Sequence, residues 1–167
     1  MSKHHRNRNW APAPQPLPED AHVIDNHTHV ASVVPFSQAM SHEAMEKGQG
    51  EVPVYSVDEL LEQAQKVGVE GVIDCGCELP NLMTAIDMAR EHPGTVHAAI
   101  AIHPNEAVLH GHRGAPGPDG LPIKYKPWHD IPFDEAMAEV HRLATTYPNQ
   151  VVAIGETGMD LFRTGES

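Results

Sequence analysis

Aromatic residues, cysteines and positive charges are all scarce in this sequence, and each shortage narrows the class of protein. Aromatic side chains are 5% of the 167 residues, so a core must rest on aliphatic side chains and alanine. Two cysteines, Cys75 and Cys77, are too few for a disulfide framework, and we expect a reducing cytoplasm. No apolar run approaches the roughly 18 residues of a membrane span, and no signal-peptide pattern is visible. A membrane protein, a secreted disulfide scaffold, a coiled coil and a wholly disordered chain are therefore excluded.

The charge is strongly acidic, with 11 Lys and Arg against 23 Asp and Glu, a formal net charge of −12. A chain this acidic does not gather nucleic acid by counterion release alone. A phosphate substrate would need local help, such as bound divalent cations. Histidine, in contrast, is abundant, with 13 residues in a chain long enough for about one domain.

The chain divides into a proline-rich segment, residues 1–20, which we expect to be a disordered tail, and a domain over residues 21–167. Short apolar runs predict strands at residues 22–27, 69–75, 96–102 and 151–155. Helical spacing and end signals predict helices at residues 56–67, 80–91 and 134–147. The first of these helices begins with a capping box, Ser56-Val-Asp-Glu59. Residues 31–53 and 110–132 are predicted to be long loops.

Strands that alternate with amphipathic helices predict an α/β fold with a parallel sheet. Four strands are half of a (β/α)8 TIM barrel, which needs about 200–250 residues. Only 11 residues follow Glu156, so we expect the N-terminal half of such a barrel, apparently truncated. Half a barrel has an exposed sheet edge, which predicts poor solubility or self-association.

Function in parallel sheets is placed at the carboxyl ends of the strands. At those ends the sequence carries residues that bind metals or move protons: Asp25, His27, His29, Asp74, Cys75, His103 and Glu156.

The first candidate is His27-Thr-His29, because residues i and i+2 of a strand point to one face. Both imidazoles could reach a single cation, with Asp25 on the same face one step deeper. A chain with 13 histidines contains such a spacing by chance, and His110-Gly-His112 is a second instance within a Gly/Pro loop. The place of His27 and His29 at a strand end favours metal binding by this pair.

The second candidate is Glu156, which follows Val-Val-Ala-Ile-Gly155 at the end of the fourth predicted strand. Gly155 allows backbone or ligand to approach closely. We expect this carboxylate to be buried in the barrel mouth, where it must be paired or bound to a metal. The alternative is a salt bridge to Arg163, while Asp160 either orients a ligand or caps the next segment.

Two further segments have open interpretations. Cys75-Gly-Cys77 is either a soft metal site, which would need two more ligands, or a pair of buried thiols. The segment Lys124-Tyr-Lys126-Pro-Trp128-His129 mixes cations with aromatic rings. It could stack a base and hold a phosphate, as single-strand binders do, or it is an ordinary lid loop.

Three motifs resemble, in order, the signatures of the TatD family of metal-dependent hydrolases, within the amidohydrolase-like barrels. They are Ile24-Asp-Asn-His-Thr-His29, Ala101-Ile-His-Pro-Asn-Glu-Ala107 and Ala153-Ile-Gly-Glu-Thr-Gly-Met-Asp-Leu-Phe-Arg163. Together the matches span about residues 22–163. The sequence departs from the family at Ala101, where glycine is common, and in a longer loop after Glu106.

The resemblance implies a TIM barrel with one or two divalent cations (Mg²⁺, Mn²⁺ or Zn²⁺) that hydrolyses phosphodiesters as a deoxyribonuclease of the 3′–5′ exonuclease type. His27 and His29 would bind the first metal, Glu156 would bridge both, and His103 would contact the phosphate or transfer a proton. Asp25, Asp160 and Arg163 would support the ligands or contact substrate.

The implied substrate is single-stranded DNA ends or a small phosphoester, and no protein partner is inferred. The alternatives are an amidohydrolase- or PHP-type hydrolase of a small ester, amide or phosphate, and an inactive fragment.

Overall fold

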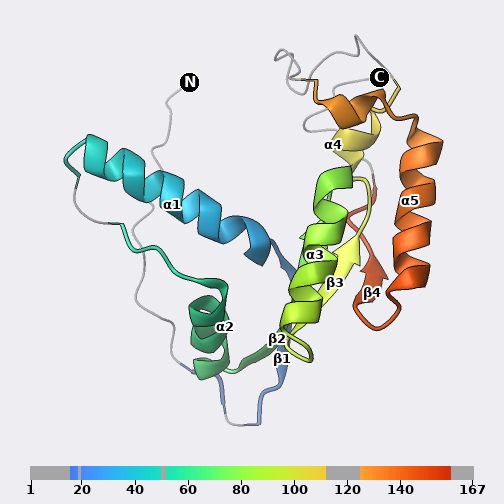
Figure 1. The fold of residues 1–167 in the computed structure, drawn as a ribbon. Coiled ribbons are helices and arrows are strands. Elements are labelled where there is room, and N and C mark those ends of the chain that lie inside the picture. Colours follow the sequence, from blue (N-terminus) through green and yellow to red (C-terminus); the bar gives the residue numbers. More distant parts are fainter. Residues whose placement is uncertain (1–15, 19, 50–51, 112–124, 159–167) are drawn as a thin grey trace, which may run out of the picture.

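The computed structural model describes residues 16–18, 20–49, 52–111 and 125–158. Within them four strands form one sheet in the order β1-β2-β3-β4, and every neighbouring pair is parallel. The strands are β1 (Val23–Thr28), β2 (Val69–Gly76), β3 (Val96–Ile100) and β4 (Val151–Ile154). Figure 1 shows helices flanking this sheet. The prediction of an α/β fold with four parallel strands is confirmed.

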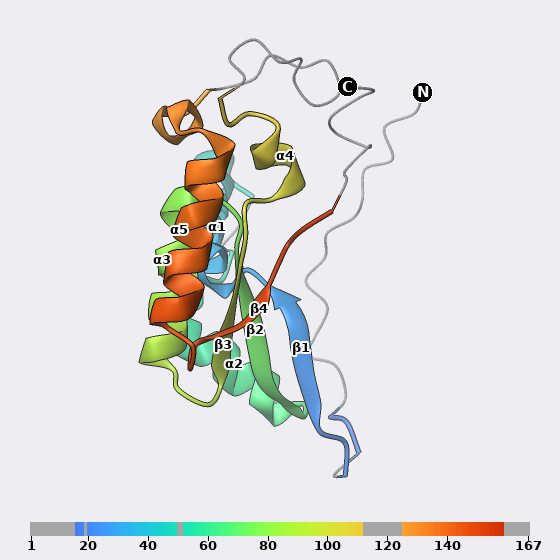
Figure 2. The same cartoon turned by 90° about the vertical axis from the view of Figure 1, so that its right-hand side faces the viewer.

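The core lies between the sheet and two helices, α3 (Leu79–Glu91) and α5 (Phe133–Thr146). Both helices cover the same face of the sheet, as Figure 2 shows. From α3, Leu82 and Ile86 are fully buried, and from β3 so is Ile100. From α5, Val140 and Leu143 join the same cluster. The helical spacing of these apolar side chains is what holds α3 and α5 against the strands.

The predicted capping box is present at the start of α2 (Val57–Lys66). The Ser56 hydroxyl accepts from the Glu59 backbone N–H at 3.2 Å, and the Ser56 N–H donates to the Glu59 carboxylate at 2.8 Å. The Ser56 N–H and the Ser56 hydroxyl, which also donates to the Glu59 carboxylate at 3.0 Å, lower the pKa of Glu59. Gly68, with a φ of +97°, follows the helix in the left-handed conformation that glycine adopts readily.

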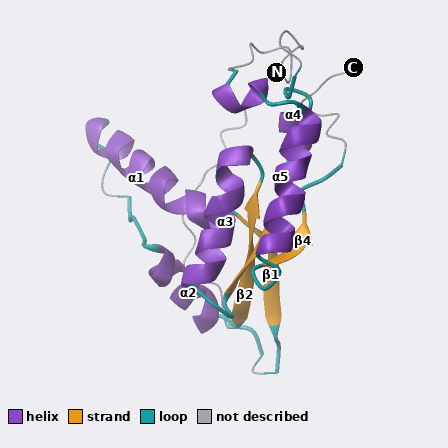
Figure 3. Ribbon diagram, turned by 45° about the vertical axis from the view of Figure 1, so that its right-hand side comes forward, coloured by secondary structure: helices purple, strands orange, loops and turns teal. Residues whose placement is uncertain are grey.

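The loop predicted for residues 31–53 is wrong over most of its length, because α1 (Val30–Glu46) occupies it. This helix contains Pro35, and its buried residues are Val30, Ser37 and Ala44. Figures 1 and 3 show it extending away from the sheet. A helix with so little buried surface carries no continuous apolar stripe, so its sequence shows no clear helical period.

The region after β3 also holds more structure than predicted. A short helix, α4 (Pro104–Ala107), follows the strand directly. Within the predicted loop over residues 110–132, a 3₁₀ turn, η2 (Pro127–Asp130), precedes α5. The prediction of a disordered tail at residues 1–20 falls largely outside the described residues. Within that segment, the Leu17 N–H donates to the Val67 carbonyl at 2.9 Å.

Candidate metal centre

The polar residues predicted at the strand ends do meet at one edge of the sheet. His27 lies near the end of β1, and His29 is the residue from which α1 begins. His103 follows β3 and stands at the start of α4, and Glu156 follows β4 by two residues. Parallel strands all end at the same edge, which is why residues far apart in the sequence converge here.

The Glu156 carboxylate is the centre of this group. Its Oε1 lies 2.9 Å from His27 Nε2 and 3.5 Å from His29 Nε2. Its Oε2 lies 3.1 Å from His103 Nε2. The Glu156 side chain is 25% exposed, less buried than the sequence predicted, and the rings of His27 and His29 are 54% and 45% exposed. One carboxylate therefore gathers three imidazoles at a solvent-accessible position.

This convergence requires a curved sheet. β1 and β4 are the first and last strands of four, and neighbouring strands lie about 4.8 Å apart, so a flat sheet would separate them by about 14 Å. The 2.9 Å contact between His27 and Glu156 spans that interval, because the sheet curls toward the face that carries them. Register shifts in the β1–β2 and β3–β4 pairs accompany the curvature.

Local hydrogen bonds fix different proton positions on two of the histidines. The Cys75 carbonyl can only accept, so the Nδ1–H of His29 donates to it at 3.2 Å, and its Nε2 keeps a lone pair. His103 is reversed, because its Nδ1 accepts from the Asn105 N–H at 3.1 Å. Its Nε2 therefore carries the proton and donates to Glu156. The Nε2 of His29 therefore has a lone pair that a metal ion could use, whereas the Nε2 of His103 donates a hydrogen bond.

The donor set fits a divalent cation. The ligand atoms of His27, His29 and Glu156 all lie within 4.8 Å of one another. Two imidazole nitrogens with one carboxylate oxygen suit Zn²⁺, Mn²⁺ or a similar ion. The carbonyl that holds the ring of His29 is the kind of outer partner that orients a ligating histidine.

Cys77 also borders the centre, a contact that the sequence did not predict although Cys75-Gly-Cys77 was named as a possible metal site. Its Sγ lies 3.5 Å from Glu156 Oε1. Burial and the neighbouring Glu156 carboxylate raise the pKa of this thiol to about 12. Cys77 directly follows β2, so the strand-end argument that selected Cys75 could have been extended by two residues to find it.

A pocket of ≈ 400 Å³ adjoins the centre between α1, the end of β2 and α3. Its walls include His29 and Cys77 from the centre, together with Asp74, Glu78 and Asn81. Asp74 is 2% exposed, and burial raises its pKa against the opposing effect of the Val30 and Ala31 N–H groups.

The Asp25 carboxylate accepts from the backbone N–H of His27 at 3.2 Å, a local contact within β1. Asp160 and Arg163 fall outside the described residues, as does His112. His110 is buried, and its Nδ1 contacts the Ile131 carbonyl at 2.8 Å, away from the centre.

Every helix in the described ranges is too short or too polar to traverse a lipid bilayer. No curated protein gives a significant match to the chain. The family model for the TatD-related DNases matches residues 24–167, which is most of the sequence and includes each strand that carries the centre. The chain therefore belongs to the TatD-related DNases, a family of metal-dependent hydrolases built on the TIM barrel.

Proposed function

We propose that this chain is a divalent-metal-dependent phosphodiesterase that removes nucleotides from the 3′ ends of single-stranded DNA. The observation that carries the proposal is the meeting of His27, His29 and His103 at the Glu156 carboxylate. Three strand ends are needed to build that arrangement. The two free cysteines are compatible with a cytoplasmic location, which we also propose.

His27, His29 and Glu156 would hold the cation. A divalent ion held there supplies Lewis acidity, which activates water and neutralises phosphate charge. That neutralisation matters because the chain carries a formal charge of −12 and would otherwise repel a polyanion. The Nε2–H of His103, which now donates to Glu156, would donate to a phosphate oxygen of a bound substrate.

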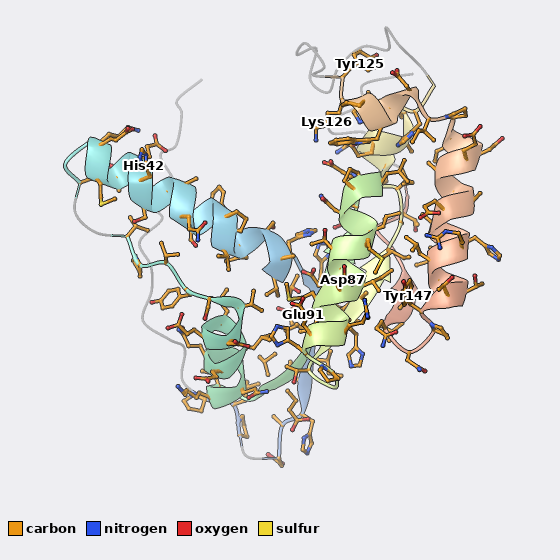
Figure 4. All side chains as sticks on the ribbon, in the orientation of Figure 1. His42, Asp87, Glu91, Tyr125, Lys126 and Tyr147 are labelled. Carbon is orange, nitrogen blue, oxygen red and sulfur yellow. The ribbon has the colours of Figure 1, made fainter. Side chains whose placement is uncertain are left out.

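Residues close to η2 favour single-stranded nucleic acid as the substrate. Lys126 Nζ lies 4.8 Å from the centre of the Trp128 ring and 3.0 Å from the Glu78 carboxylate. Tyr125 is exposed beside them, and Figure 4 shows Tyr125 and Lys126 at the same end of the molecule. Cations interleaved with aromatic rings are typical of proteins that bind unpaired bases.

A second candidate is hydrolysis of a small ester, amide or phosphate. The pocket of ≈ 400 Å³ beside His29 and Cys77 supports it, because that volume is in the range of small-molecule sites. A small substrate would fill the pocket, whereas a DNA strand would extend past it toward Lys126.

The test is a cleavage assay on a 5′-labelled single-stranded oligonucleotide with Mg²⁺, Mn²⁺ or Zn²⁺. We expect a ladder that shortens from the 3′ end, and Glu156→Gln should slow it by about 10²–10⁴-fold, as expected for loss of a positioned catalytic group. Glu70→Gln is the matched control, because Glu70 pairs with His22 and is 58% exposed.

Absence of cleavage with every ion, or cleavage that Glu156→Gln leaves intact, would overturn the proposal. Hydrolysis of p-nitrophenyl phosphate or an aryl ester without any cleavage of DNA would instead support the small-molecule candidate.

A further inference from the structure

The segment that carries His27 and His29 is attached to β2 by side chains as well as by backbone pairing. The Thr28 hydroxyl donates to the Ile73 carbonyl at 2.9 Å. The ring of His29 contacts the Cys75 carbonyl at 3.2 Å through its Nδ1. Thr28 therefore lies between the two candidate ligands in the chain and binds the neighbouring strand directly.

The pairing of β1 with β2 is irregular just before Thr28. Asp25 pairs with Val72. The next pair is Thr28 with Asp74, so three steps along β1 oppose two steps along β2. One residue of β1 is thus left out of the regular ladder beside His27, as in a β-bulge. Bulges redirect side chains near functional sites and disrupt the local ladder, so backbone pairing is weakest where His27 projects.

Thr28 is the first fixed point after this irregularity. Its side chain is partly buried, whereas the other five residues of β1 are exposed. The rings of His27 and His29 are 54% and 45% exposed, so packing does little to place them. The hydrogen bond from Thr28 to β2 is directional and adjoins both rings in the chain, and it can therefore set where the end of β1 lies.

We propose that Thr28 is a positioning residue for His27 and His29. Its hydroxyl, bonded to the Ile73 carbonyl, fixes the end of β1 and so the approach of both imidazoles to the Glu156 carboxylate. This inference rests on the metal centre of the proposed function. Outer contacts that orient metal ligands contribute to ion affinity, so loss of the hydroxyl should weaken ion binding without removing any ligand.

The test compares ion binding by the 167-residue chain and by variants of Thr28, using isothermal titration with Zn²⁺ and with Mn²⁺. Thr28→Val keeps the shape of the side chain but lacks the hydroxyl, and it should weaken binding of both ions by about 10–100-fold. Thr28→Ala also lacks the hydroxyl and should repeat that loss. Thr28→Ser keeps the hydroxyl and should bind like the unmodified chain. Binding that Glu156→Gln abolishes identifies the signal of the centre.

Thr145→Val is the matched control. The Thr145 hydroxyl donates to the His141 carbonyl at 2.9 Å within α5, so this variant also exchanges a bonded hydroxyl for a methyl group. None of the three candidate ligands comes from α5. Thr145→Val should therefore leave both ion affinities unchanged. Circular dichroism at the temperature of the titrations verifies that every variant is folded.

A second measurement needs no ion. Long-range ¹H–¹⁵N correlation spectra report which ring nitrogen of a histidine carries the proton, and His29→Gln assigns the signals of His29. We expect the Nδ1–H form in the unmodified chain and in Thr28→Ser, because the Cys75 carbonyl accepts from that nitrogen. In Thr28→Val the strand end is released, so we expect a mixture with the Nε2–H form.

The results separate the role of Thr28 from the metal centre. If Thr28→Val leaves either the ion affinities or the His29 tautomer unchanged, the role of Thr28 is overturned and the centre stands. A loss in Thr28→Ser or in Thr145→Val as large as that in Thr28→Val would also overturn it, because the hydroxyl bond to β2 would not be the cause. An unmodified chain that binds neither ion would overturn both the metal centre and this inference.

Discussion

The inner and outer strands of this sheet have different roles. In β3, four of the five residues are buried, whereas in β1 five of the six are exposed, and three of the four residues of β4 are exposed. Yet β1 and the segment after β4 supply His27, His29 and Glu156. The candidate ligands therefore come from the strands that packing holds least, and the inner strands supply the frame that aligns them.

The difference follows from where the helices lie. α3 packs over β2 and β3, and α5 packs beside α3 on the same face of the sheet. On the outer strands, Ile24, Val152 and Ile154 are 57%, 51% and 53% exposed. Backbone pairing and the side chains around Glu156 contribute much of what holds β1 and β4 in place, so mutations should affect the two kinds of strand very differently.

The largest contrast is expected from one substitution made in two strands. Ile100→Ala on β3 removes a fully buried side chain and should lower the free energy of unfolding by about 2–5 kcal/mol. Ile154→Ala on β4 removes a side chain that is 53% exposed and should change it by no more than about 0.5 kcal/mol. Urea denaturation measures both, and equal losses would break the comparison.

A smaller loss is expected from Glu106→Ala, beyond the end of β3. The Glu106 carboxylate accepts from His129 Nε2 at 2.7 Å and from Trp128 Nε1 at 3.4 Å, joining α4 to η2. His129 is 1% exposed, so loss of its partner should cost about 1–3 kcal/mol. Glu62→Ala, on the exposed side of α2, should cost no more than about 0.5 kcal/mol. Equal losses of unfolding free energy in the two variants would contradict the stabilising role of Glu106.

The buried acid of β2 should affect how stability depends on pH. Burial raises the pKa of Asp74 in the folded chain. At pH values just above the ordinary pKa of a carboxyl group, the folded state therefore binds more protons than the unfolded state. The contribution of Asp74 to the free energy of unfolding therefore falls as pH rises through that window. Asp74→Asn should remove this decrease in the free energy of unfolding. Urea denaturation at a series of pH values between about 4 and 7 measures it. An unchanged slope would show that Asp74 ionises normally.

The weakest effect is expected at exposed apolar side chains of the outer strands. Ile24 and Ile154 are apolar, exposed and on β1 and β4, so we expect the chain to self-associate through them. Ile24→Thr with Ile154→Thr should lower the sedimentation coefficient at a given concentration without lowering stability much. A chain that is monomeric before substitution would contradict the expectation.

The strands and the start of α2 could be predicted because local sequence patterns determine them. Apolar runs identify the four strands, and Ser56 with Glu59 marks the start of α2. The strand-end rule predicted that His27, His29, His103 and Glu156 would meet, and they do. Their roles as ligands and donors stay predictions.

What the sequence did not reveal depends on the whole fold. The helix α1 has few buried residues, so no apolar period marks it. The contact of Cys77 with Glu156 depends on how sharply the sheet curves and on the turn after Gly76. Alternation also predicted that Asp25 would share the site. Its carboxylate accepts from the backbone N–H of His27, and its part in the site stays a prediction.

The contact between the two edge strands of the sheet, made by His27 and Glu156, has a mechanical consequence. Glu156 contacts residues that lie in or just after β1, β2 and β3. An ion bound beside it would link these strand ends and so stabilise the curved shape of the sheet. Occupancy and curvature would then stabilise each other, and chelation would release the outer strands before it disturbed the packed interior.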